Sequence, residues 1–217
     1  MTAADLSRSR LYGILDLSYV QIHESEKMME AMIAGGVDLI QLRAKDHAIA
    51  EVGEIAANLY RIAAAHGVPF IINDHPEIAR TVSAEGVHLG QDDMPIAEAR
   101  KIAEANCIVG KSTHSVDQAI RAFQEGADYI GFGPIFATPT KPDYPPVGLS
   151  EIQKVHDAVR IPIFCIGGIK LQNLLEVIEA GARRVVIVSG LLQAPNPAEY
   201  ARAAKQMLGR RSPISDL

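Results

Sequence analysis

The 217-residue sequence predicts one α/β domain, a parallel eight-stranded (β/α)8 or TIM barrel. Three observations indicate this fold. Short apolar runs recur roughly every 20 to 30 residues, which is the size of one strand plus one helix. Runs such as Phe70–Ile72 lack polar alternation, as parallel strands buried on both faces do. Eight such units fit this length, at the lower end of the range for the barrel.

The expected strands are eight apolar, β-branched runs. They lie at Leu11–Leu15, Leu39–Arg43, Phe70–Ile72, Val87–Leu89, Cys107–Gly110, Tyr129–Phe132, Ile163–Ile166 and Val185–Val188. An open, doubly wound sheet is the structural alternative. It is disfavoured because no GxGxxG motif follows the first strand and because eight regular units favour closure. We expect a single domain over residues 1–217, with frayed ends at 1–9 and 209–217.

Helical spacing occupies the intervals between these strands. Two stretches show an apolar i, i+3, i+4, i+7 stripe, with members Val52, Ile55, Ala56, Leu59, Ile62 and Ala63 in the first, and Leu174, Val177 and Ile178 in the second. Glycines follow the helical stretches where a left-handed C′ residue is expected, at Gly36, Gly67, Gly86, Gly126 and Gly181. The pattern is therefore a regular alternation of strand and helix.

Composition excludes several classes of protein. The chain has 21 basic and 26 acidic residues, a formal charge of −5, which argues against a general nucleic-acid surface. The longest apolar runs are well short of the ~20 residues that a membrane helix needs. Residues 1–10 lack the apolar stretch of a secretory signal, and Cys107 and Cys165 each sit in an apolar run, so we expect buried free thiols and a cytoplasmic location.

The second expected strand ends in polar residues. With a period of two, Gln41, Arg43 and Lys45 point to one side if the strand continues. The carboxyl ends of barrel strands carry the active site, so these residues would place an amide and two cations at the barrel mouth. Arg suits bidentate recognition of phosphate, and Lys supplies a mobile charge. The alternative is a solvated strand end.

Carboxylates follow the next two strands. Asp74 and Asp93 come from neighbouring loops and can converge there. Two carboxylates beside a polyphosphate suit Mg²⁺, which takes a few protein oxygens plus substrate phosphate. The alternative is helix capping, since Asp74 precedes His75-Pro76 and Asp93 precedes Met94-Pro95.

The later loops carry hydroxyls and glycines. Ser112, His114 and Ser115 follow the fifth strand, but no Asp or Cys spacing supports a serine triad, and Ser115 can simply cap a helix. The connection from Gly133 to Gly148 is long and brings Thr138, Thr140 and Lys141 close together in the sequence, as binding loops or lids do, although an ordered surface loop is the alternative.

A phosphate site is predicted after the last two strands. Gly167-Gly168 and Val188-Ser189-Gly190 lie where this fold often binds phosphate through backbone N–H groups, although the glycines can also serve only a tight turn. The residues alone thus predict two anion sites, one with cations and a metal, the other with backbone and hydroxyl donors. They do not name the substrates.

Five motifs in order resemble one family, the thiamine phosphate synthases. They are Gln41-Leu42-Arg43-Ala44-Lys45; Asn73-Asp74; His88-Leu89-Gly90-Gln91-Asp92-Asp93; Gly133-Pro134-Ile135-Phe136 with Thr138-Pro139-Thr140-Lys141; and Gly167-Gly168-Ile169. The likeness runs from about Leu11 to Ala204. Gly167-Gly168-Ile169 alone is a weak signal, whereas the ordered set of five is highly specific.

The resemblance implies a reaction in which hydroxymethylpyrimidine diphosphate and hydroxyethylthiazole phosphate form thiamine phosphate and pyrophosphate. It implies a dissociative mechanism, with pyrophosphate leaving before the thiazole nitrogen attacks. The implied diphosphate ligands are Arg43, Lys45 and Asn73, and Gln41 would face the pyrimidine. The implied metal ligands for Mg²⁺ are Asp74 and Asp93. The departing pyrophosphate would be contacted by Ser112 and Lys141, and the thiazole phosphate by Thr138, Thr140, Gly168, Val188 and Ser189. Of these, Arg43, Ser112 and Lys141 are the implied catalytic residues.

One departure from the family pattern is Lys111, where many members have an apolar residue. The nearest rival function is a thiazole tautomerase of the same fold, whose proton transfer would rest on a histidine at the position of His114 and which has no need for the carboxylate pair. More distant rivals are a non-catalytic phosphate-binding barrel and a sugar-phosphate isomerase. A homodimer formed through outer helices is compatible with the sequence.

Overall fold

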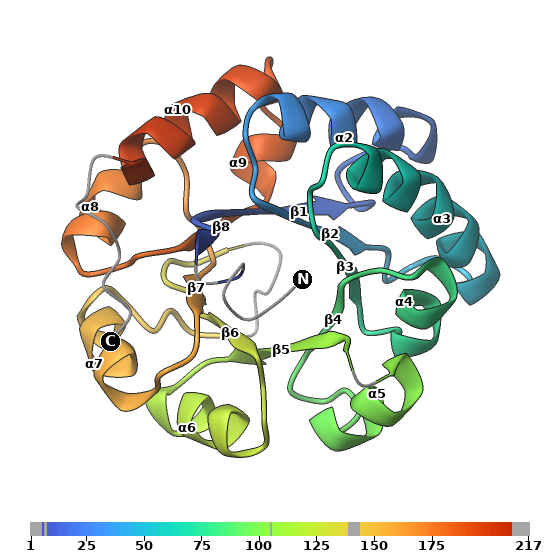
Figure 1. Ribbon diagram of the computed structural model, residues 1–217. Coiled ribbons are helices and arrows are strands. Elements are labelled where there is room, and N and C mark those ends of the chain that lie inside the picture. The colour runs from blue at the N-terminus through green and yellow to red at the C-terminus, as the bar shows by residue number, and fades with distance from the viewer. Residues whose placement is uncertain (1–5, 7, 105, 139–143, 210–217) are drawn as a thin grey trace.

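The computed structural model describes residue 6 and residues 8–104, 106–138 and 144–209. Eight parallel strands form one closed barrel in sequence order, and β1 pairs with β8 to close it (Figure 1). The strands are β1 (Leu11–Asp16), β2 (Leu39–Arg43), β3 (Phe70–Asn73), β4 (Gly86–Leu89), β5 (Ile108–Thr113), β6 (Tyr129–Phe132), β7 (Ile163–Cys165) and β8 (Val185–Ile187). The predicted barrel is confirmed, and the open sheet is excluded.

Helices surround the barrel as an outer ring (Figure 1). They are η1 (Ile22–Glu24), α2 (Ser25–Ala34), α3 (Ile49–Ala65), α4 (Pro76–Val82), α5 (Ile96–Ala103), α6 (Val116–Gln124), α7 (Ser150–Ala158), α8 (Leu174–Glu179), α9 (Ser189–Leu192) and α10 (Pro197–Gly209). Both predicted apolar stripes face inward, since every member is buried except Ile62, which is half-buried.

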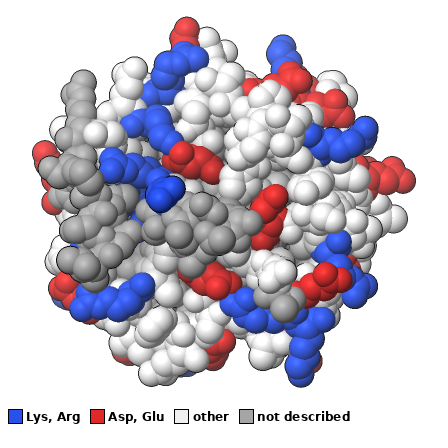
Figure 2. Space-filling view, in the orientation of Figure 1, with Lys and Arg blue, Asp and Glu red and all other residues white. Residues whose placement is uncertain are grey.

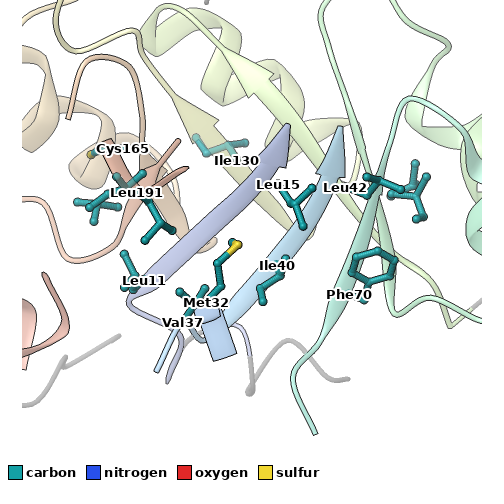
Figure 3. Packing of buried hydrophobic residues seen from close by; sticks show 14 of the residues in the cluster. Leu11, Leu15, Met32, Val37, Ile40, Leu42, Phe70, Ile130, Cys165 and Leu191 are labelled. Atoms are coloured by element: carbon teal, nitrogen blue, oxygen red, sulfur yellow. The ribbon is translucent and has the colours of Figure 1, made fainter. Parts of the chain in front are cut away.

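Two apolar layers fill the domain. The larger lies between the strands and the helices; in it Met32 and Val37 lie over β1 and β2, beside Leu11 and Ile40 (Figure 3). The smaller lies inside the barrel and comprises Leu6, Tyr12, Ile14, Leu39, Ile71, Ile108, Tyr129, Phe164 and Val186. Alternate residues of each strand supply the two layers, as the pleat of a strand requires. The barrel interior is therefore a packed core.

Aromatic rings form the centre of the inner layer. Phe164 packs edge-on against both Tyr12 and Tyr129, at centroid distances of 5.3 and 5.6 Å. The ring of Tyr129 occupies the space above Gly110, where a Cβ atom would lie 2.1 Å from the ring. The glycine in β5 thus makes room for the tyrosine of β6.

Three local expectations are corrected. Gly86 begins β4 and does not end a helix; Ser83, with φ of 62°, takes the left-handed position after α4. Strand β5 begins at Ile108 and continues to Thr113, so Ser112 is a strand residue whose side chain is fixed by the sheet. Within the segment 1–9 that we expected to fray, Leu6 is fully buried and closes the inner layer.

Other expectations agree with the structure. Gly36, Gly67, Gly126 and Gly181 all have positive φ. Cys107 and Cys165 are buried free thiols. No helix among the described residues is long and apolar enough to cross a membrane. On the face shown in Figure 2, basic side chains are interspersed with acidic ones and do not gather in one broad patch.

Replacing Gly110 by alanine should destabilise the protein by about 1–3 kcal/mol, because the rigid ring of Tyr129 must move. The matched control is Gly53→Ala in α3, where no atom lies within 4 Å of the added Cβ. That change should stabilise the protein by about 0.5–1 kcal/mol. Chemical denaturation measures both. Equal effects of the two substitutions would contradict the packing described for the interior.

Candidate active site

A cavity opens where the strands end, and residues of all eight strands or of the loops that follow them line it. The lining residues include Asp16, Gln41, Arg43, Lys45, Asn73, Asp74, His88, Ser112, Thr138, Gly168, Val188 and Ser189. Every described residue of the predicted substrate site is in this set. Asp93 adjoins the cavity behind Gly90. Thr140 and Lys141 lie outside the described residues.

An ion pair at the rim holds Arg43. Its Nη1 atom donates to Asp16 Oδ2 at 2.6 Å, and Asp16 is buried while Arg43 retains some exposure. Asp16 ends β1 and Arg43 ends β2, and the two residues pair directly in the sheet register. Because one edge of the guanidinium is fixed by a buried carboxylate, the remaining N–H groups are held ready for an anion. Sequence reasoning missed Asp16.

The two predicted metal ligands meet. Asp74 follows β3 and Asp93 lies in the loop after β4, and their carboxyl groups are within hydrogen-bonding reach of each other. Lys45 Nζ lies 3.5 Å from Asp74 Oδ2. The backbone N–H of Gly90 donates to Asp93 Oδ2 at 2.5 Å. The loop backbone therefore fixes one carboxylate, and a mobile cation adjoins the other.

Proximity and burial separate the pKa values of this pair. Burial, and then the hydrogen bond and charge of Asp93, raise the pKa of Asp74 to about 6. Burial also acts to raise the pKa of Asp93, but hydrogen bonds from Asp74 and Gly90 and the charges of Lys45 and Lys111 outweigh it, so this pKa is lowered. In the absence of a cation the pair can thus retain a proton, on Asp74.

The capping interpretation of the two aspartates is wrong. Helix α4 has His75 at its N-cap and α5 has Pro95, and neither cap has a side-chain hydrogen bond. Asp74 has a φ of 65°, a conformation uncommon for residues with a side chain but less so for Asp. Ser115, by contrast, does cap α6, accepting from Gln118 N at 3.2 Å.

Lys111 stabilises the loop that carries Asp93. Its side chain is buried, and its Nζ donates to the carbonyl of Gly90 at 2.7 Å. Gln91 of the same loop donates to the backbone carbonyl of Ser112. Two side chains therefore connect this loop to β5, and the positive charge of Lys111 acts on Asp93 from behind the cavity.

A chain of hydrogen bonds runs beneath the cavity, inside the barrel. Gln41 Nε2 donates to Asn73 Oδ1 at 3.1 Å, and Tyr12 Oη donates to Gln41 Oε1 at 2.6 Å. The hydroxyls of Tyr12 and Tyr129 are 3.1 Å apart. His88 then contacts Tyr129 Oη through Nδ1 at 3.1 Å and Ser112 Oγ through Nε2 at 3.0 Å.

This hydrogen-bond chain connects the predicted site residues Asn73, Gln41 and Ser112. It does so through Tyr12, His88 and Tyr129, to which the sequence analysis assigned no role. Tyr12, His88 and Tyr129 each lie on a strand and point to the barrel axis. The strand period of two that predicts the orientation of Gln41 and Arg43 also predicts that these three side chains point inward. It does not predict which of the interior polar groups form hydrogen bonds with one another.

The loops after β7 and β8 form the other side of the cavity. Gly167 and Gly168 have φ of 99° and 66°, and a Cβ on Gly168 would lie 2.7 Å from Phe136. Asn173 Nδ2 donates to the carbonyl of Gly168 at 2.9 Å. Tyr200 Oη accepts from Leu171 N at 2.9 Å. Side chains on the outer side of these loops thus hold their backbone in place. Gly168, Val188 and Ser189 line the cavity on the inner side.

His114 closes one wall of the cavity. Its Nδ1 lies 2.5 Å from the carbonyl oxygen of Gly133, and its ring packs on Tyr144 at a centroid distance of 4.0 Å. It therefore connects the end of β5 to two points of the connection between β6 and α7, Gly133 at its start and Tyr144 further along.

Comparison with known proteins decides the family. A model described as thiamine monophosphate synthase matches residues 11–191. The thiamine-phosphate synthase of Shouchella clausii (strain KSM-K16) is 44% identical over 200 residues, 92% of this chain and 94% of the relative. That of Halalkalibacterium halodurans is 46% identical over 186 residues, 85% of this chain and 88% of the relative. The chain belongs to the thiamine-phosphate synthase family.

A solved structure agrees with this assignment. The thiamine phosphate pyrophosphorylase from Pyrococcus furiosus superposes with a TM-score of 0.86 at 30% identity, covering 94% of this chain and 97% of that one. The activity is that of a thiamine-phosphate synthase, a transferase that couples a pyrimidine diphosphate with a thiazole phosphate.

The raised pKa of Asp74 makes a prediction for the metal-free synthase. A carboxyl whose pKa is higher in the folded than in the unfolded state destabilises the fold increasingly as pH rises from about 4 to about 6. Asp74→Asn should therefore raise the melting temperature in EDTA at pH 8 by more than at pH 4. The control is Asp92→Asn, at the exposed acid beside Asp93. An effect of Asp74→Asn that does not change with pH would contradict the coupled pair.

Proposed function

We propose that the cavity binds the two substrates on opposite sides, with the diphosphate against β2–β5 and the thiazole phosphate against β7 and β8. The observation that supports this most directly is the separation of charge in the lining. Arg43, Lys45 and Asp74 line one side, with Asp93 in contact with Asp74, and backbone and hydroxyl donors line the other. The assignment of residues to substrates follows the family resemblance given above.

The carboxylate pair fits a Mg²⁺ site. Mg²⁺ prefers oxygen ligands and takes one or two carboxylates together with substrate phosphates. Asp74 and Asp93 supply two such groups held against each other, an arrangement that a divalent cation relieves. No group of three or more His, Cys, Asp or Glu suited to a metal occurs in the described part of the chain, so the diphosphate would complete the coordination. Bound there, Mg²⁺ would stabilise negative charge on the leaving pyrophosphate.

The protein's own groups would act mainly on the departing anion. The guanidinium of Arg43, oriented by Asp16, and the ammonium of Lys45 would hold the diphosphate oxygens and stabilise the charge that builds there as the bond breaks. Ser112 would donate to the same group. Lys141, outside the described residues, is proposed as a further cation on the strength of the resemblance.

The remaining residues would hold the two rings for a dissociative reaction. Gln41 is buried at the cavity floor and would bind the pyrimidine, whose methylene carries positive charge after pyrophosphate leaves. Ile14, Ile166 and Val186 line the same cavity and limit access of water to that cation. Thr138, Gly168, Val188 and Ser189, with Thr140, would place the thiazole nitrogen for attack. The scheme requires no covalent enzyme intermediate.

Pyrophosphate release tests this proposal. The protein is mixed with the pyrimidine diphosphate, the thiazole phosphate and Mg²⁺, and we expect release that stops when EDTA is added. Asp93→Ala should lower the rate by about 100-fold or more while keeping the native circular dichroism spectrum. Asp92→Ala, one residue away and exposed, should retain the rate.

Release that continues in EDTA, or full activity of Asp93→Ala with Mg²⁺, would contradict the metal assignment. Tautomerisation of the thiazole phosphate that survives EDTA, without coupling, would instead favour the rival activity.

A further inference from the structure

The hydrogen-bond chain beneath the cavity has a limited number of hydrogens, and this number restricts the directions in which its contacts can donate. It connects Asn73, Gln41, Tyr12, Tyr129, His88 and Ser112 through five contacts of 2.6–3.1 Å. Each tyrosine hydroxyl in it has one hydrogen and takes part in two contacts, whereas the Ser112 hydroxyl takes part in one. When its hydrogen is used within the chain, each tyrosine hydroxyl donates in one contact and accepts in the other. A neutral imidazole ring obeys the same rule, since one nitrogen donates and the other accepts.

All five contacts must consequently run in the same direction along the chain. Both tyrosines keep their hydrogens, because burial raises the pKa of Tyr12 and of Tyr129 well above the usual value. Only two arrangements then satisfy every contact. They differ in the tautomer of His88, in the orientation of the Gln41 and Asn73 amides and in the direction of the Ser112 hydroxyl.

The structure has the first arrangement. Tyr12 donates to Gln41 Oε1, so Tyr129 must donate to Tyr12, and His88 must donate from Nδ1 to Tyr129. The unprotonated Nε2 of His88 then accepts from Ser112. In this arrangement Ser112 presents only lone pairs to the cavity, and an anion there gains no hydrogen bond from it.

The second arrangement reverses every donor. His88 carries its hydrogen on Nε2 and donates to Ser112, whose own hydrogen becomes available to the cavity. At the other end of the chain, Gln41 and Asn73 both exchange the positions of their amide oxygen and nitrogen, so that Asn73 donates to Gln41 and Gln41 donates to Tyr12. The net number of protons is unchanged, because the ring takes a proton from solvent at Nε2 and returns one from Nδ1.

We propose that His88 is a positioning residue that couples the two ends of this chain: binding of the diphosphate reverses the direction, so that Ser112 becomes a donor and Gln41 changes the group that it presents to the pyrimidine. The proposal rests on the proposed contact between Ser112 and the diphosphate. It adds that recognition of the ring and of the leaving group are linked through the barrel interior, by Tyr12 and Tyr129.

Nitrogen NMR of the histidine ring tests this directly. Protein labelled with ¹⁵N-histidine is recorded free and with Mg²⁺ and inorganic pyrophosphate, and the His88 signals among the seven histidines are assigned with His88→Gln. We expect hydrogen on Nδ1 in the free protein and on Nε2 with pyrophosphate bound. The same tautomer in both states, or a doubly protonated ring in the complex, would overturn the proposal.

Tyr129→Phe interrupts the chain and leaves the packing of the ring on Phe164 in place. Because the Tyr129 hydroxyl no longer accepts from Nδ1, His88 should carry its hydrogen on Nε2 whether or not pyrophosphate is present. Because Ser112 is then already a donor, pyrophosphate should bind at least about threefold more tightly than to the native protein. The control is Tyr60→Phe, which alters a partly buried tyrosine of α3 that takes no part in the hydrogen-bond chain. This substitution should change neither the tautomer of His88 nor the affinity for pyrophosphate.

Pyrophosphate binding to Arg43→Ala distinguishes failure of the coupling from failure of the diphosphate site. Normal pyrophosphate binding that Arg43→Ala weakens, combined with an unchanged His88 tautomer, would overturn the coupling alone. Pyrophosphate that binds equally well to Arg43→Ala would overturn both the proposed diphosphate site and the coupling that rests on it.

Discussion

The site depends on two carboxyl groups that the fold holds in contact. Asp74 and Asp93 follow β3 and β4, which are neighbours in the closed barrel, and their carboxyl groups lie within hydrogen-bonding reach of each other. In isolation such a pair is unfavourable, since two negative charges at hydrogen-bonding distance repel each other in a partly buried place. The backbone of Asp74 also adopts a positive φ, which costs about 1 kcal/mol. Strained arrangements of this kind cluster at functional sites, which supports the proposed cation site.

Neighbouring cations reduce the repulsion between the two carboxylates but do not separate them. Lys45 faces Asp74 across 3.5 Å, and Lys111 holds the Asp93 loop from behind through Gly90. On the next strand pair, the buried carboxylate of Asp16 directs Arg43 to the same rim. The result is a cluster of paired opposite charges around one side of the cavity. The opposite side, after β7 and β8, presents mostly backbone groups and hydroxyls.

The sequence predicted the fold, and it predicted that the candidate site residues would gather at one end of the barrel, because both follow from periodicity. Uninterrupted apolar runs placed the strands, and polar residues at their carboxyl ends necessarily meet at one rim once the barrel closes. Periodicity does not describe pairings across the barrel interior. The ion pair of Asp16 with Arg43 and the contacts of Tyr12, His88 and Tyr129 depend on strand register and shear, which no single segment specifies. The capping interpretation of Asp74 and Asp93 failed because the Asp-X-Pro pattern brings a carboxylate close to a helix start without fixing which residue is the N-cap; that residue is His75 in α4 and Pro95 in α5.

Counting the divalent cations bound to the protein tests the central claim most directly. Mn²⁺ is titrated in the presence of pyrophosphate and followed by electron paramagnetic resonance, for the native protein and for Asp74→Asn and Asp93→Asn. The account requires one ion per chain in the native protein and loss of that binding in each variant. An ion that binds with unchanged affinity after either carboxylate has been removed would show that the pair does not form the metal site.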